Sequence, residues 1–164
     1  MTGPRGLLDV RRFVLTSSAI NPAMIALKEA GARCDEAFAL LGGTLSQDGE
    51  ALEFTSCFVP EQTPYRTPDG VMVEVSGSAL HRANLEFYRR GEIMAGQVHS
   101  HPSDAYHSQL DDALPLVTLL GALSVVIPDF AAAGTASLDR WACYRLIGPS
   151  AWRAMKGEEL EYRT

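Results

Sequence analysis

The sequence predicts a single α/β (α+β) domain in which helices flank a mixed, mostly antiparallel sheet. Two observations predict this class. The chain has 164 residues, of which 46% are hydrophobic, and this is enough to bury one good core. Strand-like and helix-like segments also mix along the chain, without an internal repeat or a low-complexity tract. We therefore expect one domain over residues 1–164, with its core at about 13–148.

The first third of the chain is predicted to form a strand, a helix and a hairpin. Residues 13–17 are typical of a short strand, and Asn21-Pro22 has the pattern of an N-cap and first-turn proline for a helix to about Arg33. The almost wholly apolar run 36–45 predicts a buried strand. A turn at Asp48-Gly49 then leads into a second strand that pairs with the first.

The middle of the chain is predicted to hold a loop, two strands and a helix. Three prolines in residues 60–70 favour a loop, and the alternating segment 71–76 predicts a third core strand. Ser76 or Ser78 is expected to cap a helix to about Arg90. The apolar segment that follows, which ends at a proline, predicts a buried strand that emerges at the surface.

In the last third, a serine at 108 is expected to cap a helix over residues 108–120. Residues 122–130 and 138–148 predict two more strands. The last sixteen residues, from Pro149, are expected to form a short peripheral helix or a loose tail.

Charge and hydropathy exclude several partners. The formal net charge of −6 and the pI near 5.1 argue against nucleic acid, because binding to phosphates needs clustered basic residues. No uncharged apolar run reaches the ~18 residues of a membrane span, and the N-terminus lacks the apolar region of a signal peptide. We therefore expect a cytoplasmic protein without membrane contact.

The three cysteines, Cys34, Cys57 and Cys143, are an odd number without close pairing. This favours reduced, packed thiols over a disulfide framework. Cys34 is accordingly expected to be a small buried hydrophobic residue.

Residues 97–115 hold three of the four histidines and suggest a metal site. His99 and His101 alternate on a predicted strand, so both imidazoles project from the same face. Ser108 opens the next helix, whose first turn presents Asp111 toward the strand end. His, His and Asp suit Zn²⁺ and leave its fourth position to water, as in catalytic zinc sites. His107, in the loop, is expected to support this site from its rim instead of binding metal.

V-H-S-H-P followed by S-Q-L-D resembles the signature of the JAMM, or MPN-plus, zinc metalloproteases, a class of peptidases and isopeptidases. The family pairs H-x-H-P and S-x-x-D with a distant glutamate at the start of an early core strand, and Glu36 in CDEAFALLGG stands in that context. The resemblance covers residues 36 to about 130. It implies an MPN/JAB-like fold in which His99, His101 and Asp111 hold zinc, Glu36 is the acid/base group and Ser108 assists the reacting carbonyl.

One departure from the family pattern affects the third ligand. Five residues separate Pro102 from Ser108 where the family usually has six, so counting from the histidines selects Asp112 and counting from the serine selects Asp111. We choose Asp111, because the Ser-to-Asp spacing lies within one rigid helical turn while a loop can lose a residue cheaply. Asp112 is then expected to face solvent or to support a ligand.

Two of the assigned residues have simpler alternatives. Taken alone, Glu36 fits a solvated acid at a helix–strand junction better than a catalytic group, and only the motif context reverses this preference. Ser108 fits a helix N-cap as well as a donor to the tetrahedral oxyanion, and the two roles are compatible.

The resemblance further implies cleavage after the C-terminal glycine of a ubiquitin-like protein, by a bacterial stand-alone member of the family. We expect it to act in a bacterial ubiquitin-like conjugation system, of the antiphage kind, with E1-like and E2-like proteins as further partners. Two alternatives are a peptidase that processes sulfur-carrier proteins and a non-catalytic scaffold, and a third is hydrolysis of a small molecule. The complete ligand set argues against the scaffold.

Overall fold

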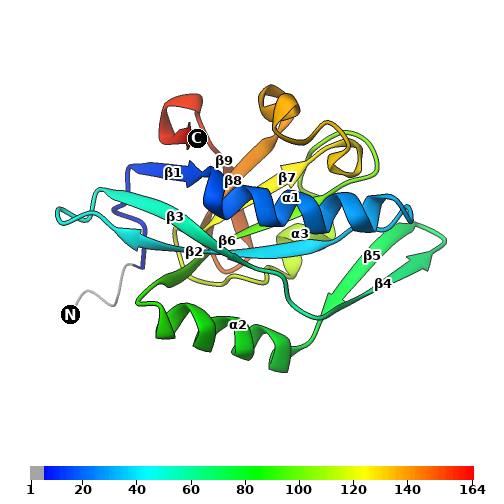
Figure 1. Ribbon diagram of the computed structural model, residues 1–164, viewed down its shortest axis with the longest axis horizontal. Helices are drawn as coiled ribbons and strands as arrows, with labels where there is room; N and C mark the ends of the chain where they lie inside the picture. The colour runs from blue at the N-terminus through cyan, green and yellow to red at the C-terminus, as the bar shows by residue number, and fades with distance from the viewer. Residues whose placement is uncertain (1–5) are drawn as a thin grey trace.

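The computed structural model describes residues 6–164, so residues 1–5 of the expected domain lie outside the described part. An eight-stranded sheet in the order β10-β1-β3-β2-β6-β7-β8-β9 forms its centre (Figure 1). Neighbouring strands are antiparallel at four of the seven junctions. This confirms the predicted mixed, mostly antiparallel sheet flanked by helices.

The main-sheet strands are β1 (Arg12–Thr16), β2 (Phe38–Leu45), β3 (Ala51–Phe58), β6 (Ile93–Ser100), β7 (Leu123–Ile127), β8 (Ala142–Gly148), β9 (Ala151–Ala154) and β10 (Leu160–Arg163). A separate two-stranded sheet contains β4 (Gln62–Thr67) and β5 (Gly70–Val75). The helices are α1 (Ser17–Gly31), α2 (Gly77–Arg89) and α3 (Gln109–Ala113), with short 3₁₀ helices η1 (Asp129–Ala131), η2 (Gly134–Arg140) and η3 (Gly157–Glu159).

The two long helices cover opposite faces of the sheet. Leu41 of β2 lies in the core cluster that contains the buried face of α1, including Ile20. Its neighbour Leu40 lies in the second cluster, with Phe87 of α2. Adjacent strand residues point to opposite faces, so α1 and α2 are separated by the sheet. Within residues 6–164, no helix combines the length and apolarity needed to cross a membrane.

Glycine at position 42 lets α2 approach β2 closely. A Cβ atom built at Gly42 would meet Cδ1 of Phe87 at 2.2 Å, far inside van der Waals contact. The aromatic ring therefore occupies the space that a side chain on the strand would fill.

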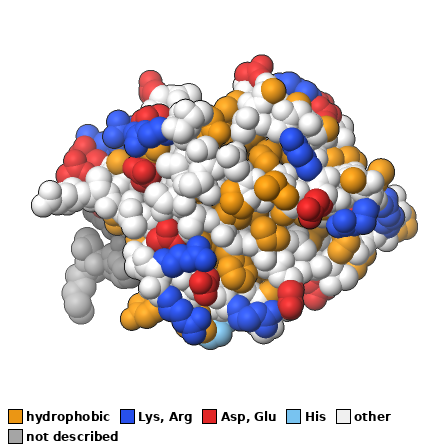
Figure 2. All heavy atoms as spheres, viewed as in Figure 1, with side chains coloured by type: hydrophobic (Ala, Val, Ile, Leu, Met, Phe, Trp, Pro, Cys, Tyr) orange, Lys and Arg blue, Asp and Glu red, His pale blue; other side chains and the backbone are white. Residues whose placement is uncertain are grey.

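The surface is charged but mixed. On the face shown in Figure 2, lysine and arginine side chains are interspersed with aspartates and glutamates, and exposed hydrophobic side chains lie between them.

Helix α1 begins one turn earlier than the sequence predicts. Thr16 is its N-cap, and the Thr16 hydroxyl accepts a hydrogen bond from the Ala19 N–H at 3.4 Å. The predicted N-cap at Asn21 is therefore wrong, and Pro22 lies inside the helix. The proline lacks an N–H group, so α1 loses one backbone hydrogen bond there. Apolar residues on both sides of Pro22 bury the helix and outweigh this loss.

Residues 60–76 differ most from their prediction. The expected loop contains β4, with Pro64 inside the strand, and 71–75 forms β5 as its partner instead of a third core strand. Proline is tolerated because β4 pairs on one side only, so a missing N–H can face away from the ladder. None of the residues in β5 is fully buried, which explains why its alternation does not mark a core strand.

The third helix and the tail also differ from the prediction. Helix α3 ends at Ala113, because Pro115 cannot continue it. The tail after Pro149 is mainly strand instead of a peripheral helix or a loose segment: β9 pairs with β8, β10 pairs in parallel with β1, and only the short 3₁₀ helix η3 lies between them.

All three cysteines are free, as expected, and Cys57 and Cys143 are partly buried. Cys34 is exposed, so its predicted burial is wrong. Its φ of 57° places it in the left-handed region just after α1, where the chain turns outward.

Candidate metal centre

Strand β6 brings two imidazoles together in the interior. His99 lies in β6 beside Val126 of β7, and the His101 N–H continues the pairing by donating to the Ile127 carbonyl at 2.9 Å. The two Nε2 atoms are 3.2 Å apart, and both side chains are buried. The geometry thus agrees with the predicted alternation, with both rings on one face of the strand.

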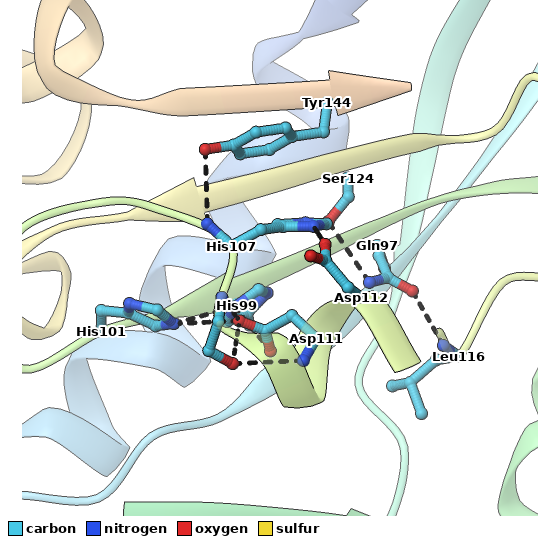
Figure 3. Close-up of polar contacts among 10 residues, drawn as sticks. Gln97, His99, His101, His107, Asp111, Asp112, Leu116, Ser124 and Tyr144 are labelled. Atoms are coloured by element: carbon cyan, nitrogen blue, oxygen red, sulfur yellow. Dashed lines mark hydrogen bonds and ion pairs between the residues drawn. The ribbon is translucent and has the colours of Figure 1, made fainter. Parts of the chain in front are cut away.

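Helix α3 adds a carboxylate to this pair (Figure 3). Oδ1 of Asp111 lies 3.4 Å from Nε2 of His99, and Oδ2 lies 3.4 Å from Nε2 of His101. Burial opposes the charge, but hydrogen bonds with His101, His99 and the Ser108 backbone hold the pKa of Asp111 well below its usual range. Burial lowers the pKa of His99 and favours its neutral, metal-binding form.

The three donor groups fit a tetrahedrally coordinated metal ion. Their ligand atoms all lie within 4.8 Å of one another. Metal–ligand bonds of about 2.0–2.2 Å, as zinc makes, separate tetrahedral ligands by roughly 3.3–3.6 Å. The two imidazole nitrogens are 3.2 Å apart, close to this range, and each of them lies 3.4 Å from a different oxygen of the Asp111 carboxylate. His99, His101 and Asp111 can therefore hold a metal ion.

A second carboxyl group, that of Glu36, faces the cluster from the neighbouring strand. Strand β2 is antiparallel to β6 with Phe38 opposite His99, and extending this register by two residues sets Glu36 opposite His101. The pairing does continue there, since the Ser100 N–H donates to the Ala37 carbonyl at 3.3 Å. Burial raises the pKa of Glu36 to about 7, with His101 lowering it and Asp111 raising it. A carboxyl with such a pKa exchanges protons near neutrality.

The β4–β5 hairpin fixes the segment that precedes β2. The Gln62 side chain accepts from the Phe38 N–H at 2.7 Å and donates to the Phe38 carbonyl at 2.9 Å. Arg66 donates to the carbonyls of Arg33 and Cys34 at 3.0 and 3.1 Å. Glu36 lies between these two anchored points, so the hairpin restricts the backbone that presents it.

Ser108 is the N-cap of α3 and contacts Asp111 directly. Its hydroxyl accepts from the Asp111 N–H at 3.1 Å and donates to Asp111 Oδ2 at 2.8 Å. The Ser108 N–H donates to the same oxygen at 2.8 Å, which completes a capping box. The helix start thus holds Oδ2, which faces His101, while Oδ1 faces His99.

Asp112 points away from the two clustered histidines. Its Oδ1 lies 2.9 Å from Nδ1 of His107, and its side chain is 47% exposed. The His107 ring is buried, and its Nε2 bonds to Ser124 Oγ at 2.8 Å. Ser124 and Gln97 were not predicted from the sequence. Each is a polar residue in an otherwise apolar strand, and this was the available signal, because a buried polar group requires a partner.

Comparison with known proteins identifies the family. No family model matches the chain. The chain is 36% identical over 146 residues to the probable metalloprotease y4jG of Sinorhizobium fredii, which covers 89% of this chain and 88% of that protein. The chain belongs to this metalloprotease family.

In this metalloprotease, aromatic rings flank the two clustered histidines. Phe38 stacks on His99 with ring centroids 4.6 Å apart, and Tyr106 presents its ring edge-to-face to His101 at 4.7 Å. Tyr106 is 51% exposed, so it forms part of the rim between the cluster and solvent. A cavity of about 560 Å³ lies elsewhere in the metalloprotease, beside Asp48 and Arg145, and shares no residue with the cluster.

Proposed function

We propose that this metalloprotease is a zinc-dependent peptidase and isopeptidase that cleaves after the C-terminal glycine of a ubiquitin-like protein. One observation supports the chemistry above all others: two imidazole nitrogens and a carboxylate converge within 4.8 Å, and the Glu36 carboxyl faces them across the strand pair. A structural ion pair needs no second carboxyl with a raised pKa, whereas amide hydrolysis does need a proton carrier.

In this proposal, His99, His101 and Asp111 hold the zinc ion. When bound, zinc supplies Lewis acidity and lowers the pKa of water toward ~7. Glu36 accepts the proton of the attacking water and later delivers it to the departing amine, which is a poor leaving group until protonated. The raised pKa of Glu36, about 7, suits both transfers, although a bound cation will lower it.

Ser108 has two roles in this proposal. Its hydroxyl lies 2.8 Å from the Asp111 carboxylate and orients this ligand. The same hydroxyl then exchanges that acceptor for the oxyanion that develops on the reacting carbonyl, a contribution worth about 3 kcal/mol for one donor.

The substrate assignment is supported by the resemblance of the V-H-S-H-P and S-Q-L-D motifs to the JAMM family. A C-terminal glycine lets an extended backbone pass close to a buried metal. We place the enzyme in the bacterial cytoplasm, in a ubiquitin-like conjugation system of the antiphage kind. Its partners there are the modifier, its conjugates and the E1-like and E2-like proteins of the pathway.

The test is a panel of purified fusions in which a bacterial ubiquitin-like protein, a sulfur-carrier protein or an unrelated peptide precedes a reporter through a peptide or an isopeptide bond. The proposal expects zinc-dependent cleavage after the modifier's terminal glycine for both bond types, and none with Glu36→Gln. Cleavage of the sulfur carrier alone would replace the assigned substrate. Absence of any cleavage by the zinc-loaded protein would favour a scaffold or hydrolysis of a small molecule.

A further inference from the structure

A series of buried and partly buried hydrogen bonds runs beside the metal cluster and shares no residue with it (Figure 3). The Gln97 carbonyl oxygen accepts from the N–H groups of Leu116 and Val117 at 2.9 and 3.1 Å. Its amide nitrogen donates to Ser124 Oγ at 3.3 Å, Ser124 bonds to His107 Nε2 at 2.8 Å, and His107 Nδ1 bonds to Asp112 at 2.9 Å.

The donors and acceptors available in this series of hydrogen bonds fix its direction. The two backbone donors fix the Gln97 oxygen, so its NH₂ group faces Ser124. The Asp112 carboxylate can only accept, so His107 carries its hydrogen on Nδ1 and donates it to Asp112. In this neutral tautomer Nε2 is an acceptor, so the Ser124 hydroxyl donates to it while accepting from Gln97. Every bond points toward Asp112, which ends the chain as a pure acceptor.

The Asp112–His107–Ser124 order matches that of a hydrolytic triad, but it does not make a second catalytic centre. Ser124 is 0% exposed within β7, so its hydroxyl cannot reach a substrate. Its single hydrogen is already donated to His107, and it also accepts from Gln97. The arrangement therefore serves to hold elements together.

The elements that it joins are those of the metal cluster. Gln97 is on β6, two residues before His99 and on the same face, while Asp112 directly follows Asp111 on α3. Helix α3 has only five residues and no buried side chain, so apolar packing cannot fix its position. The His107 ring is held in place by two aromatic rings: it stacks on Tyr144 with ring centroids 4.1 Å apart and packs edge-to-face against Trp152 with ring centroids 4.8 Å apart.

We propose that His107 is a positioning residue that, through Asp112, Ser124 and Gln97, locks α3 onto the sheet and so sets the Asp111 carboxylate against His99 and His101. This inference rests on the proposed metal site. It assigns the binding strength of that site to residues that do not touch the ion. Substitution of such supporting groups typically weakens metal binding about 10–100-fold.

The test is zinc affinity, measured by chelator competition, and the absorption spectrum of the Co²⁺-loaded protein. We expect Ser124→Ala and Asp112→Ala to raise the Kd for zinc about tenfold or more and to alter the Co²⁺ bands. Asp112→Asn keeps an acceptor for His107 and should restore the Kd to within about threefold of the parent. Asp104→Ala removes an equal charge from an exposed position in the loop that precedes α3 and is the matched control, expected to leave the Kd unchanged.

Unfolding midpoints of the metal-free variants show whether each variant folds. If Ser124→Ala does not fold, the Kd values of Asp112→Ala and Asp112→Asn alone test the inference. Equal Kd values for the parent and Asp112→Ala would overturn the inference while leaving the proposed function intact. The inference would also be overturned if Asp104→Ala raised the Kd for zinc as much as Asp112→Ala does, because the effect would then be one of charge only. It would be overturned as well if Asp112→Asn failed to restore the Kd, because Asp112 would then be a ligand. A parent protein that binds no zinc would instead refute the proposed function and the inference together.

Discussion

In the proposed mechanism, Glu36 carries a proton without also binding the ion. Asp111 contacts both clustered histidines, and its lowered pKa favours the carboxylate form that a metal ligand needs. The carboxyl of Glu36 is half-buried opposite His101, with a pKa raised to about 7 by burial. The two carboxyl groups therefore have different environments, which fit the separate roles of ligand and acid/base group that we propose for them.

Glu36→Gln should lower kcat by about 10²–10⁴-fold while zinc content stays near one ion per chain, because the amide cannot transfer the proton. Metal analysis and steady-state kinetics on the same preparation test this. Asp111→Ala serves as the contrast and should lose the metal. If Glu36→Gln lost the metal as well, Glu36 would be a ligand and its assigned role would be wrong.

At the residue scale, local spacing predicted much of the cluster. The alternation of His99 and His101 on a strand and the turn from Ser108 to Asp111 are short-range features, and the structure brings these side chains together. The pairing of Glu36 with this group has no local signal, because it depends on the register between β2 and β6. It was inferred only from the resemblance.

At the element scale, the β4–β5 hairpin anchors the start of β2 near the site, and the C-terminal strands β9 and β10 extend the two edges of the sheet. Strand β4 was not predicted because three prolines in residues 60–70 favoured a loop. Strands β9 and β10 were not predicted because four residues each are too few to show a clear hydrophobic period. Parallel pairing of β10 with β1 joins the two ends of the described chain, and nothing local in either segment predicts it. The long, strongly apolar segments β2, β6 and β7 were predicted because burial on both faces leaves a continuous hydrophobic run.

Gln62→Ala should reduce kcat about tenfold or more without reducing zinc content, because it removes two hydrogen bonds to the Phe38 backbone and loosens the segment that carries Glu36. Thr63→Ala, at an exposed neighbouring position of β4, is the control. Kinetics and metal analysis of both variants check this. Equal kcat values for the two would mean that the hairpin does not position Glu36.

Glu159→Gln should destabilise the C-terminal segment by about 1–2 kcal/mol at neutral pH, because charge-assisted hydrogen bonds are lost. Glu159 accepts from Arg153 at 2.9 and 2.6 Å and from the Lys156 N–H at 2.7 Å. The Arg153 hydrogen bonds lower its pKa to about 2 in the folded state, from a usual value of 4.5. The stability difference should thus be complete above about pH 4.5 and disappear as the pH falls toward 2.

Denaturant unfolding of the parent and of Glu159→Gln across this pH range measures the difference in free energy of unfolding. Glu158→Gln, at the adjacent exposed position, is the control. A difference that persisted unchanged at pH 2 would show that the carboxylate charge is not its cause.

In the whole molecule, the metal cluster joins the central sheet to a small peripheral element. His99 lies near the end of β6, His101 directly follows that strand, and Asp111 comes from a five-residue helix, so a bound ion would link a rigid layer to a small peripheral element. The ion binds the folded chain, in which these groups converge, and it should therefore stabilise the fold.

Zinc at 100 times its Kd should add about 2.7 kcal/mol to the free energy of unfolding and raise Tm by about 5–10 °C. Calorimetry with and without zinc measures this shift. His101→Ala should lose it, since the variant has only two ligands. An equal shift in that variant would place the stabilising ion elsewhere.

The most direct test of the metal centre is anomalous diffraction from crystals of the zinc-loaded protein, collected on both sides of the zinc absorption edge. The account predicts one strong peak within bonding distance of Nε2 of His99, Nε2 of His101 and the Asp111 carboxylate. A peak held by His107 and Asp112, or no peak among these residues, would contradict it.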